Sequence, residues 1–174
     1  MSQESSSLGR RDLLKAVAGM AAATQLTSGV THAAINTPQP TGKPGDFDFL
    51  AGEWRIKNRR FRDKVWDTFD GEATVHPILA GIGSVEELRI PARNFSGMGL
   101  RLLDVERKLW ADYFVNAKSG VLTPPPAWGS FVNGVGTWDA DYKDGDKPMI
   151  VRGVWDQITA NSCRWFQAVS CDDG

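Results

Sequence analysis

Hydrophobic and polar residues alternate one by one along much of the chain after Gly52, and this period of two is typical of half-buried β-strands. In the first such stretch, Trp54, Ile56 and Asn58 would share one face of a strand, with basic residues on the other face. Further strands are predicted at about 67–76, 81–90, 97–105, 109–115, 136–142, 149–158 and 163–171. No stretch of ten or more residues after Gly52 has the period of a helix.

Turn-forming residues separate these runs at intervals of about 8 to 14 residues, a spacing that favours an all-β sandwich or an antiparallel up-and-down barrel. The chain stops at Asp172-Asp173-Gly174, which is a strong hairpin-turn signal with no returning strand after it. Either the last strand is short and already present, or the sequence is a fragment that lacks its C-terminal strand. We favour the second interpretation.

A short helical turn is predicted just before the first strand. Asp46 could cap it, and the turn would present Phe47, Leu50 and Phe49 to a core. Gly52 would end it.

The first 33 residues have the three parts of a bacterial export signal. Arg10 and Arg11 are followed, after Asp12, by Leu-Leu-Lys, then by a weakly apolar stretch and by small residues at Thr31, Ala33 and Ala34. The arginine pair points to the twin-arginine translocase as a partner during export and to the periplasm as the destination. The apolar stretch is too short and too polar to span a membrane. A lipid anchor is not expected either, because the residues near the cleavage site include no cysteine. Residues 34–45 contain three prolines and are predicted to be a linker, with the domain at 46–174.

The charge balance limits the kinds of partner. The net charge is -1, which does not favour binding to nucleic acid. The one basic cluster, at residues 57–64, is predicted to be a solvated strand end. Cys163 and Cys171 would lie roughly 26 Å apart on one extended strand, so an intramolecular disulfide is not expected.

Residues that could carry chemistry are few. His76 is the only histidine securely inside the predicted domain, so neither a metal site nor a bound cofactor is expected. No nucleophile motif is present, which leaves His76 as the candidate general base of any enzyme. The acidic pairs Glu86–Glu87 and Asp139–Asp141 are interpreted as solvated faces or turns.

Several motifs are shared with a known family. They are FDFLAGEW at the start of the domain, W-x-x-F-x-G at Trp66–Gly71, ILAGIGSVEE at Ile78–Glu87 and the terminal SCDDG. From about residue 46 onward the chain therefore resembles an uncharacterised lipocalin-like family of bacterial β-barrels, whose members usually continue with one more strand. The Gly52-Glu53-Trp54 triplet is also similar to the G-x-W of lipocalins and of the haem-carrying nitrobindins. The resemblance implies a lipocalin-like barrel, but no histidine follows His76 to serve as a haem ligand.

Aromatic and inward-facing polar residues give the candidate ligand site. All seven tryptophans lie in the predicted domain, where they could fill the core or line an apolar pocket. By alternation from Trp54, Asn58 and Arg60 face inward, and by alternation from Trp165, Gln167 does so too. Trp155 and Trp165 are predicted to line the cavity, whereas Trp54 is predicted to plug the closed end of the barrel. The predicted ligand-binding residues are Asn58, Arg60, Trp155, Trp165 and Gln167.

Three functions remain open. The first is an exported, non-enzymatic protein that binds a small apolar or aromatic ligand. The second is a cofactor-free isomerase, cyclase or hydrolase that uses His76. The third is an accessory protein that binds a partner through the proline-rich loop at 124–128.

Overall fold

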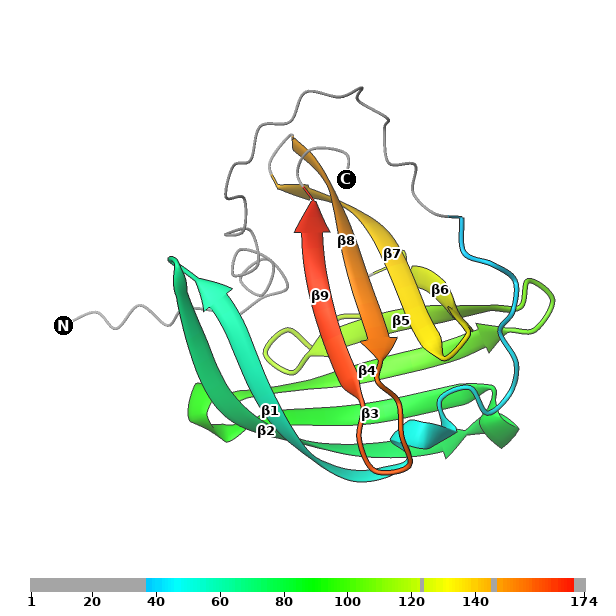
Figure 1. The fold of residues 1–174 in the computed structure, drawn as a ribbon, viewed down its shortest axis with the longest axis horizontal. Coiled ribbons are helices and arrows are strands. Elements are labelled where there is room, and N and C mark those ends of the chain that lie inside the picture. The colour runs from blue at the N-terminus through cyan, green and yellow to red at the C-terminus, as the bar shows by residue number, and fades with distance from the viewer. Residues whose placement is uncertain (1–36, 123, 145–146, 171–174) are drawn as a thin grey trace.

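The computed structural model describes residues 37–122, 124–144 and 147–170, and in this part the chain forms nine antiparallel strands in a single sheet. The strands are β1 (Gly52–Arg62), β2 (Val65–Ile78), β3 (Gly83–Ile90), β4 (Phe95–Asp104), β5 (Leu109–Asn116), β6 (Ala127–Val132), β7 (Val135–Asp144), β8 (Lys147–Asp156) and β9 (Arg164–Ser170). Three short 3-10 helices accompany them: η1 (Asp48–Leu50), η2 (Leu79–Gly81) and η3 (Pro91–Arg93). Each strand pairs with its neighbours in chain order, which confirms the predicted all-β, up-and-down fold (Figure 1).

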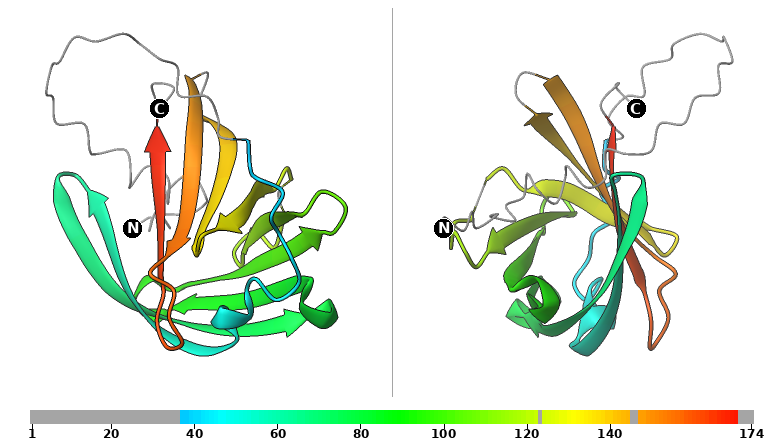
Figure 2. Two further views of the ribbon diagram at one scale, coloured as in Figure 1. Left: turned by 45° about the vertical axis from the view of Figure 1, so that its right-hand side comes forward. Right: turned by 90° about the vertical axis from the view of Figure 1, so that its left-hand side faces the viewer.

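The sheet curls into a half-barrel rather than closing completely (Figure 2). Within the described residues, β1 pairs only with β2 and β9 pairs only with β8, so the two edge strands are not paired with each other. We call the face that carries the buried core residues the inner face and the opposite one the outer face. The alternation of burial is clearest on β4, where every second residue, from Phe95 to Leu103, is buried.

Two hairpins have tight turns that require the left-handed region of the backbone. Asp63 and Lys64, between β1 and β2, have φ of 50° and 65°. Asn133 and Gly134, between β6 and β7, have φ of 52° and 79°. Positive φ at both central residues matches the right-handed twist of the adjoining strands, and asparagine and glycine adopt it readily.

One end of the half-barrel is closed by η1 and an aromatic core. Phe47 and Leu50 are 4% and 3% exposed, as expected, and they pack with the buried rings of Trp110 and Trp138. Asp46 does not cap η1, which has no side-chain cap, so that prediction is wrong. Its carboxylate instead accepts a hydrogen bond from the Trp110 indole at 3.0 Å. A buried indole N–H needs an acceptor more than the short helix needs a cap.

The predicted linker is docked on the sheet as far as it is described. The carbonyl of Gln39 accepts a hydrogen bond from Ser130 at 2.6 Å, and the Thr41 hydroxyl donates to the Phe131 carbonyl at 2.8 Å. The amide of Gly42 donates to the Lys108 carbonyl at 2.8 Å. Residues 39–42 therefore belong to the folded domain, although their composition alone is typical of a linker.

Candidate functional site

The predicted ligand-binding residues all lie on the inner face. Asn58 and Arg60 continue the alternation of inward residues along β1. On the opposite edge strand, Trp165 pairs with Trp155, and Gln167 follows it on the same face. These residues come from the first and last strands of the half-barrel, which are not paired with each other in the described part of the chain.

Each polar member of this set has a buried atom without a hydrogen-bond partner. In the part of the chain that the structure describes, these atoms are Asn58 Nδ2, Arg60 Nε and Gln167 Oε1. Leaving a buried polar atom unpaired costs about 1–3 kcal/mol, so such atoms are normally satisfied by protein, water or ligand. Their unmet capacity marks this part of the inner face as a place where another molecule could bind.

The predicted cavity tryptophans differ in their surroundings. Trp155 is 8% exposed and packs against Phe47, Phe49 and Trp165, at ring-centroid distances of 6.5, 5.9 and 6.4 Å. It belongs to the core cluster, and its role in lining a ligand cavity stays a prediction. Trp165 is 45% exposed, so its ring can be contacted from outside.

Trp54 lies where a plug would be placed. Its ring is partly buried against the core cluster, and its indole N–H donates to the carbonyl of Leu50 in η1 at 2.7 Å. This bond ties the start of β1 to the closed end of the half-barrel.

A buried arginine that was not singled out from the sequence lies near the centre of the inner face. Arg101 on β4 is 5% exposed and forms a close hydrogen-bonded ion pair with Glu86 on β3. Its Nε lies 3.9 Å from the Asp112 carboxylate. Its guanidinium lies 5.2 Å from the Phe47 ring centroid and 5.3 Å from that of Trp155, within reach of cation–π interaction.

The charge of Arg101 is held in place by its carboxylate partners. Burial by itself lowers the pKa of Arg101, but Glu86 and Asp112 outweigh it, so the pKa is raised. Arg101 Nη1 has no hydrogen-bond partner among the described residues. A Cβ at Gly99 would lie 3.3 Å from both Arg101 Nη2 and Glu86 Oε2, so a glycine here leaves room for the ion pair.

The interpretation of the acidic pairs as solvated is wrong for two of their members. The Glu86 side chain is only 14% exposed because it faces Arg101 on the inner face. The Asp139 side chain is 5% exposed and accepts two hydrogen bonds of 2.7 Å from Arg152. Arginine partners bury these carboxylates in a way that a short acidic pair in the sequence does not reveal.

Cys163 lies within the electrostatic influence of the same cluster. Burial and the Glu86 carboxylate raise the pKa of the Cys163 thiol, and Arg101 offsets this only in part. The thiolate is the nucleophilic form of cysteine, so this environment does not favour a catalytic role. Cys171 lies outside the described residues, and the prediction that it forms no bridge with Cys163 stays a prediction.

A second arginine cluster lies toward the turn of the β1–β2 hairpin. Arg60 faces Asp67 across the hairpin, with Nη2 3.6 Å from Oδ2. Arg93, from η3, donates to Asp67 Oδ1 at 2.5 Å, and its guanidinium lies 4.9 Å from the Phe69 ring centroid. Asn58 is paired with Phe69 in the register of the hairpin. We call Asn58, Arg60, Asp67, Phe69 and Arg93 the hairpin cluster.

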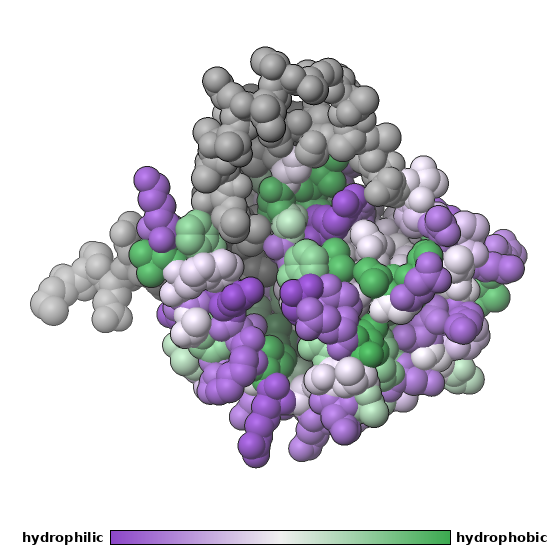
Figure 3. Space-filling view, viewed as in Figure 1, coloured by the Kyte–Doolittle hydropathy of each residue, from purple (hydrophilic) through white to green (hydrophobic). Residues whose placement is uncertain are grey.

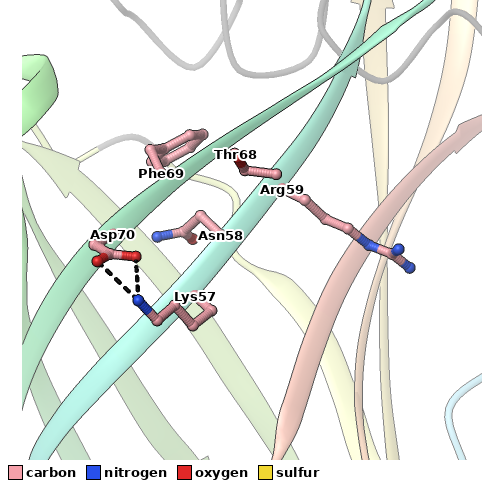
Figure 4. Close-up of a pocket in the computed structure, with 6 residues that line it drawn as sticks. All are labelled: Lys57, Asn58, Arg59, Thr68, Phe69 and Asp70. Carbon is pink, nitrogen blue, oxygen red and sulfur yellow. Dashed lines mark hydrogen bonds and ion pairs between the residues drawn. The ribbon is translucent and has the colours of Figure 1, made fainter.

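A cleft of about 570 Å³ lies beside this cluster and is lined in part by Asn58 and Phe69 (Figure 4). Lys57 and Asp70 form an ion pair of 2.8 Å at its rim. The rest of the basic stretch behaves largely as predicted, since Lys57, Arg59, Arg62 and Lys64 are exposed. Arg60 is the exception, because alternation along β1 places it on the inner face.

His76 lies on the other side of the sheet. It is exposed on the outer face of β2, between the buried inward residue Val75 and the exposed Pro77. A general base must lie within hydrogen-bond reach of the proton that it removes. His76 therefore cannot act on a ligand bound to the inner face.

The described residues contain no group of three or more His, Cys, Asp or Glu side chains that could hold a metal ion. Nor does this part of the chain contain a helix long and apolar enough to cross a membrane. Arg10 and Arg11, the core of the predicted export signal, lie outside the described residues.

No protein-family model matches this chain, and no curated protein matches it either. The chemistry of the inner face therefore carries the functional argument.

Proposed function

We propose that this protein binds a small apolar or aromatic molecule on the inner face of its half-barrel. The observation that carries the proposal is that both edge strands present buried polar atoms without partners to the same face. Asn58 Nδ2 and Arg60 Nε do so on β1, and Gln167 Oε1 does so on β9. A few polar groups that orient a ligand within a mostly apolar surface are characteristic of small-molecule sites.

The apolar part of such a ligand has aromatic surface available. Trp165 lies on the same face as Gln167 and keeps 45% of its surface exposed. Beneath it, the ring of Trp155 continues the apolar surface into the core. Tryptophan combines a large contact area with few rotatable bonds, so it contributes affinity at low entropic cost.

A fluorescence titration with N-phenyl-1-naphthylamine, an uncharged aromatic dye, tests the proposal. Trp165→Ala should weaken binding by about five- to tenfold, since an aromatic contact contributes about 0.5–1.5 kcal/mol beyond its buried area. Trp66→Ala is the matched control, because Trp66 is similarly exposed, at 49%, but lies on the outer face of β2. Absence of dye binding to the unaltered protein, or an equal effect of the two variants, would contradict the proposal.

The two other functions receive less support. The enzyme hypothesis depended on His76, which lies on the outer face. For the accessory role, the described residues on the face seen in Figure 3 intersperse hydrophilic side chains with small hydrophobic areas. Partner-binding surfaces are more often marked by a wide apolar area.

The place of action is a separate proposal that rests on the sequence. Arg10, Arg11 and the stretch that follows them support export through the twin-arginine route, so that binding would take place in the periplasm.

A further inference from the structure

The arginines of the inner face differ in how their charge is balanced. Arg101 faces two carboxylates, those of Glu86 and Asp112. Arg60 and Arg93 instead share the single carboxylate of Asp67. The hairpin cluster therefore carries one positive charge in excess, whereas the group around Arg101 does not.

The two carboxylate oxygens of Asp67 face different arginines. Its Oδ1 accepts the 2.5 Å hydrogen bond from Arg93, while its Oδ2 lies 3.6 Å from Arg60, beyond hydrogen-bond distance. The Arg60 side chain is nevertheless only 15% exposed. A largely buried guanidinium with one distant carboxylate partner has donors available for another acceptor.

Three buried nitrogen atoms of this cluster have no hydrogen-bond partner within the described part of the protein. They are Asn58 Nδ2, Arg60 Nε and Arg93 Nε, and all three are donors. Asn58 and Arg60 are two residues apart on the same face of β1, and Arg93 reaches the residues paired with both, namely Phe69 and Asp67. A group that accepts several hydrogen bonds would suit these three donors.

We propose that Asn58, Arg60 and Arg93 form an anion-binding subsite that holds the carboxylate, sulfonate or phosphate group of an amphipathic ligand. This inference rests on the proposed function, because the apolar part of the same ligand would lie against the inner face. An oxyanion supplies both the acceptors that the three donors lack and the negative charge that Asp67 does not provide. A neutral carbonyl or hydroxyl would supply the acceptor alone.

The surroundings of the cluster favour the same sign of charge. On the same hairpin Lys57 and Arg62 are paired with Asp70 and Asp63, whereas Arg59 and Lys64 add positive charge, and a positive potential raises the local concentration of anions. The cleft at this hairpin is lined by Asn58 and Phe69 of the inner face and by residues of the outer face, namely Lys57, Arg59, Thr68 and Asp70 (Figure 4). The Phe69 ring, beneath the Arg93 guanidinium, adds an apolar wall next to the charged group.

Two dyes with a similar aromatic skeleton, one charged and one uncharged, test the contribution of ligand charge separately from that of apolar contact. The probes are 8-anilino-1-naphthalenesulfonate, which carries a sulfonate, and the uncharged N-phenyl-1-naphthylamine. The unaltered full chain should bind the sulfonate at least about tenfold more tightly, and 0.5 M KCl should reduce this preference because salt screens exposed charge. Binding of the neutral dye should change little with salt.

Arg60→Gln and Arg93→Gln should each weaken sulfonate binding by about tenfold or more, and each should weaken sulfonate binding more than neutral-dye binding. Arg55→Gln is the matched control, since it removes the same charge from an exposed position on the outer face of β1. It should leave the affinity for both dyes within about twofold of the unaltered protein.

The possible results separate the two proposals. If the neutral dye does not bind the unaltered protein, the proposed function fails. If the neutral dye binds but the sulfonate is not preferred, or if Arg55→Gln weakens sulfonate binding as much as Arg60→Gln does, the anion subsite alone is overturned. Should a glutamine variant fail to fold, the dye preference of the unaltered protein and its salt dependence decide the question.

Discussion

Replacing Glu86 by glutamine tests how far the buried charge of Arg101 depends on its closest carboxylate. The substitution keeps the shape and the hydrogen-bonding oxygen of the side chain but removes its charge. Arg101 is 5% exposed and cannot recover its hydration without a rearrangement of β3 and β4. The guanidinium would then keep Asp112, at 3.9 Å, as its charged partner.

The expected cost is a large part of the free energy of unfolding. Removing one partner of a buried ion pair typically costs about 3–5 kcal/mol, and we expect about 3 kcal/mol here because Asp112 still offsets part of the charge. Domains of this size unfold with about 5–15 kcal/mol. Glu87→Gln is the control, since Glu87 is the next residue on β3, lies on the outer face and has a 64% exposed side chain paired with Arg89. Its loss should cost less than about 1 kcal/mol.

Urea unfolding followed by tryptophan fluorescence measures both variants. The Glu86→Gln variant should have a clearly lower midpoint at an unchanged denaturant slope, while Glu87→Gln should unfold close to the unaltered protein. The double variant Glu86→Gln/Arg101→Met should lose less free energy of unfolding than the two single variants lose together, because the two residues interact. Equal midpoints for the Glu86 and Glu87 variants would refute the conclusion that the Arg101–Glu86 pair is buried and coupled.

Three further predictions concern other parts of the chain. Burial raises the pKa of the Cys163 thiol, so its alkylation by iodoacetamide in a variant without the second cysteine should accelerate only above the ordinary thiol pKa of about 8.5. The free energy of unfolding should also fall as the pH rises above that value, since the thiol ionises at lower pH in the unfolded chain than in the folded one. Alkylation that follows the pH profile of a free cysteine would contradict both expectations. Trp155→Ala should lower the free energy of unfolding in urea by about 3–5 kcal/mol, and Trp54→Ala should lower it by less because Trp54 is only partly buried. A larger loss for Trp54→Ala would contradict the conclusion that Trp155 is the more deeply packed of the two. Lys-Lys in place of Arg10 and Arg11 should leave the precursor in the cytoplasm on cell fractionation, and normal delivery to the periplasm would show that the pair does not direct export.

The fold was largely predictable because alternation is a local property of the sequence. Burial follows the predicted parity on β1, and the pairing of β9 with β8 puts Gln167 on the same face as Trp155, so Asn58, Arg60 and Gln167 were correctly placed on the inner face. The strand β6 was not predicted, since Ala127–Val132 is short and follows a proline-rich segment. On β4, leucines occur on both faces of the strand, so the pattern around Arg101 does not indicate which way the arginine points.

The candidate site was predictable only in part, because partners from distant strands decide what each side chain does. Arg93 comes from a turn with no alternation of its own, and its contacts with Asp67 and Phe69 join segments about 25 residues apart. Glu86 appeared solvated beside Glu87 until the register of β3 and β4 brought it to Arg101.

By itself, the sequence determined the all-β class and the inward parity of the edge strands, because successive side chains of a strand must point to opposite faces. It also determined the aromatic character of the domain and the near-neutral charge. Only the tertiary structure decided which tryptophan is buried, which acidic residues are paired and where positive charge exceeds negative charge. Those properties depend on the curl of the sheet and on the register of residues far apart in the chain, and a local period of two contains no information about either.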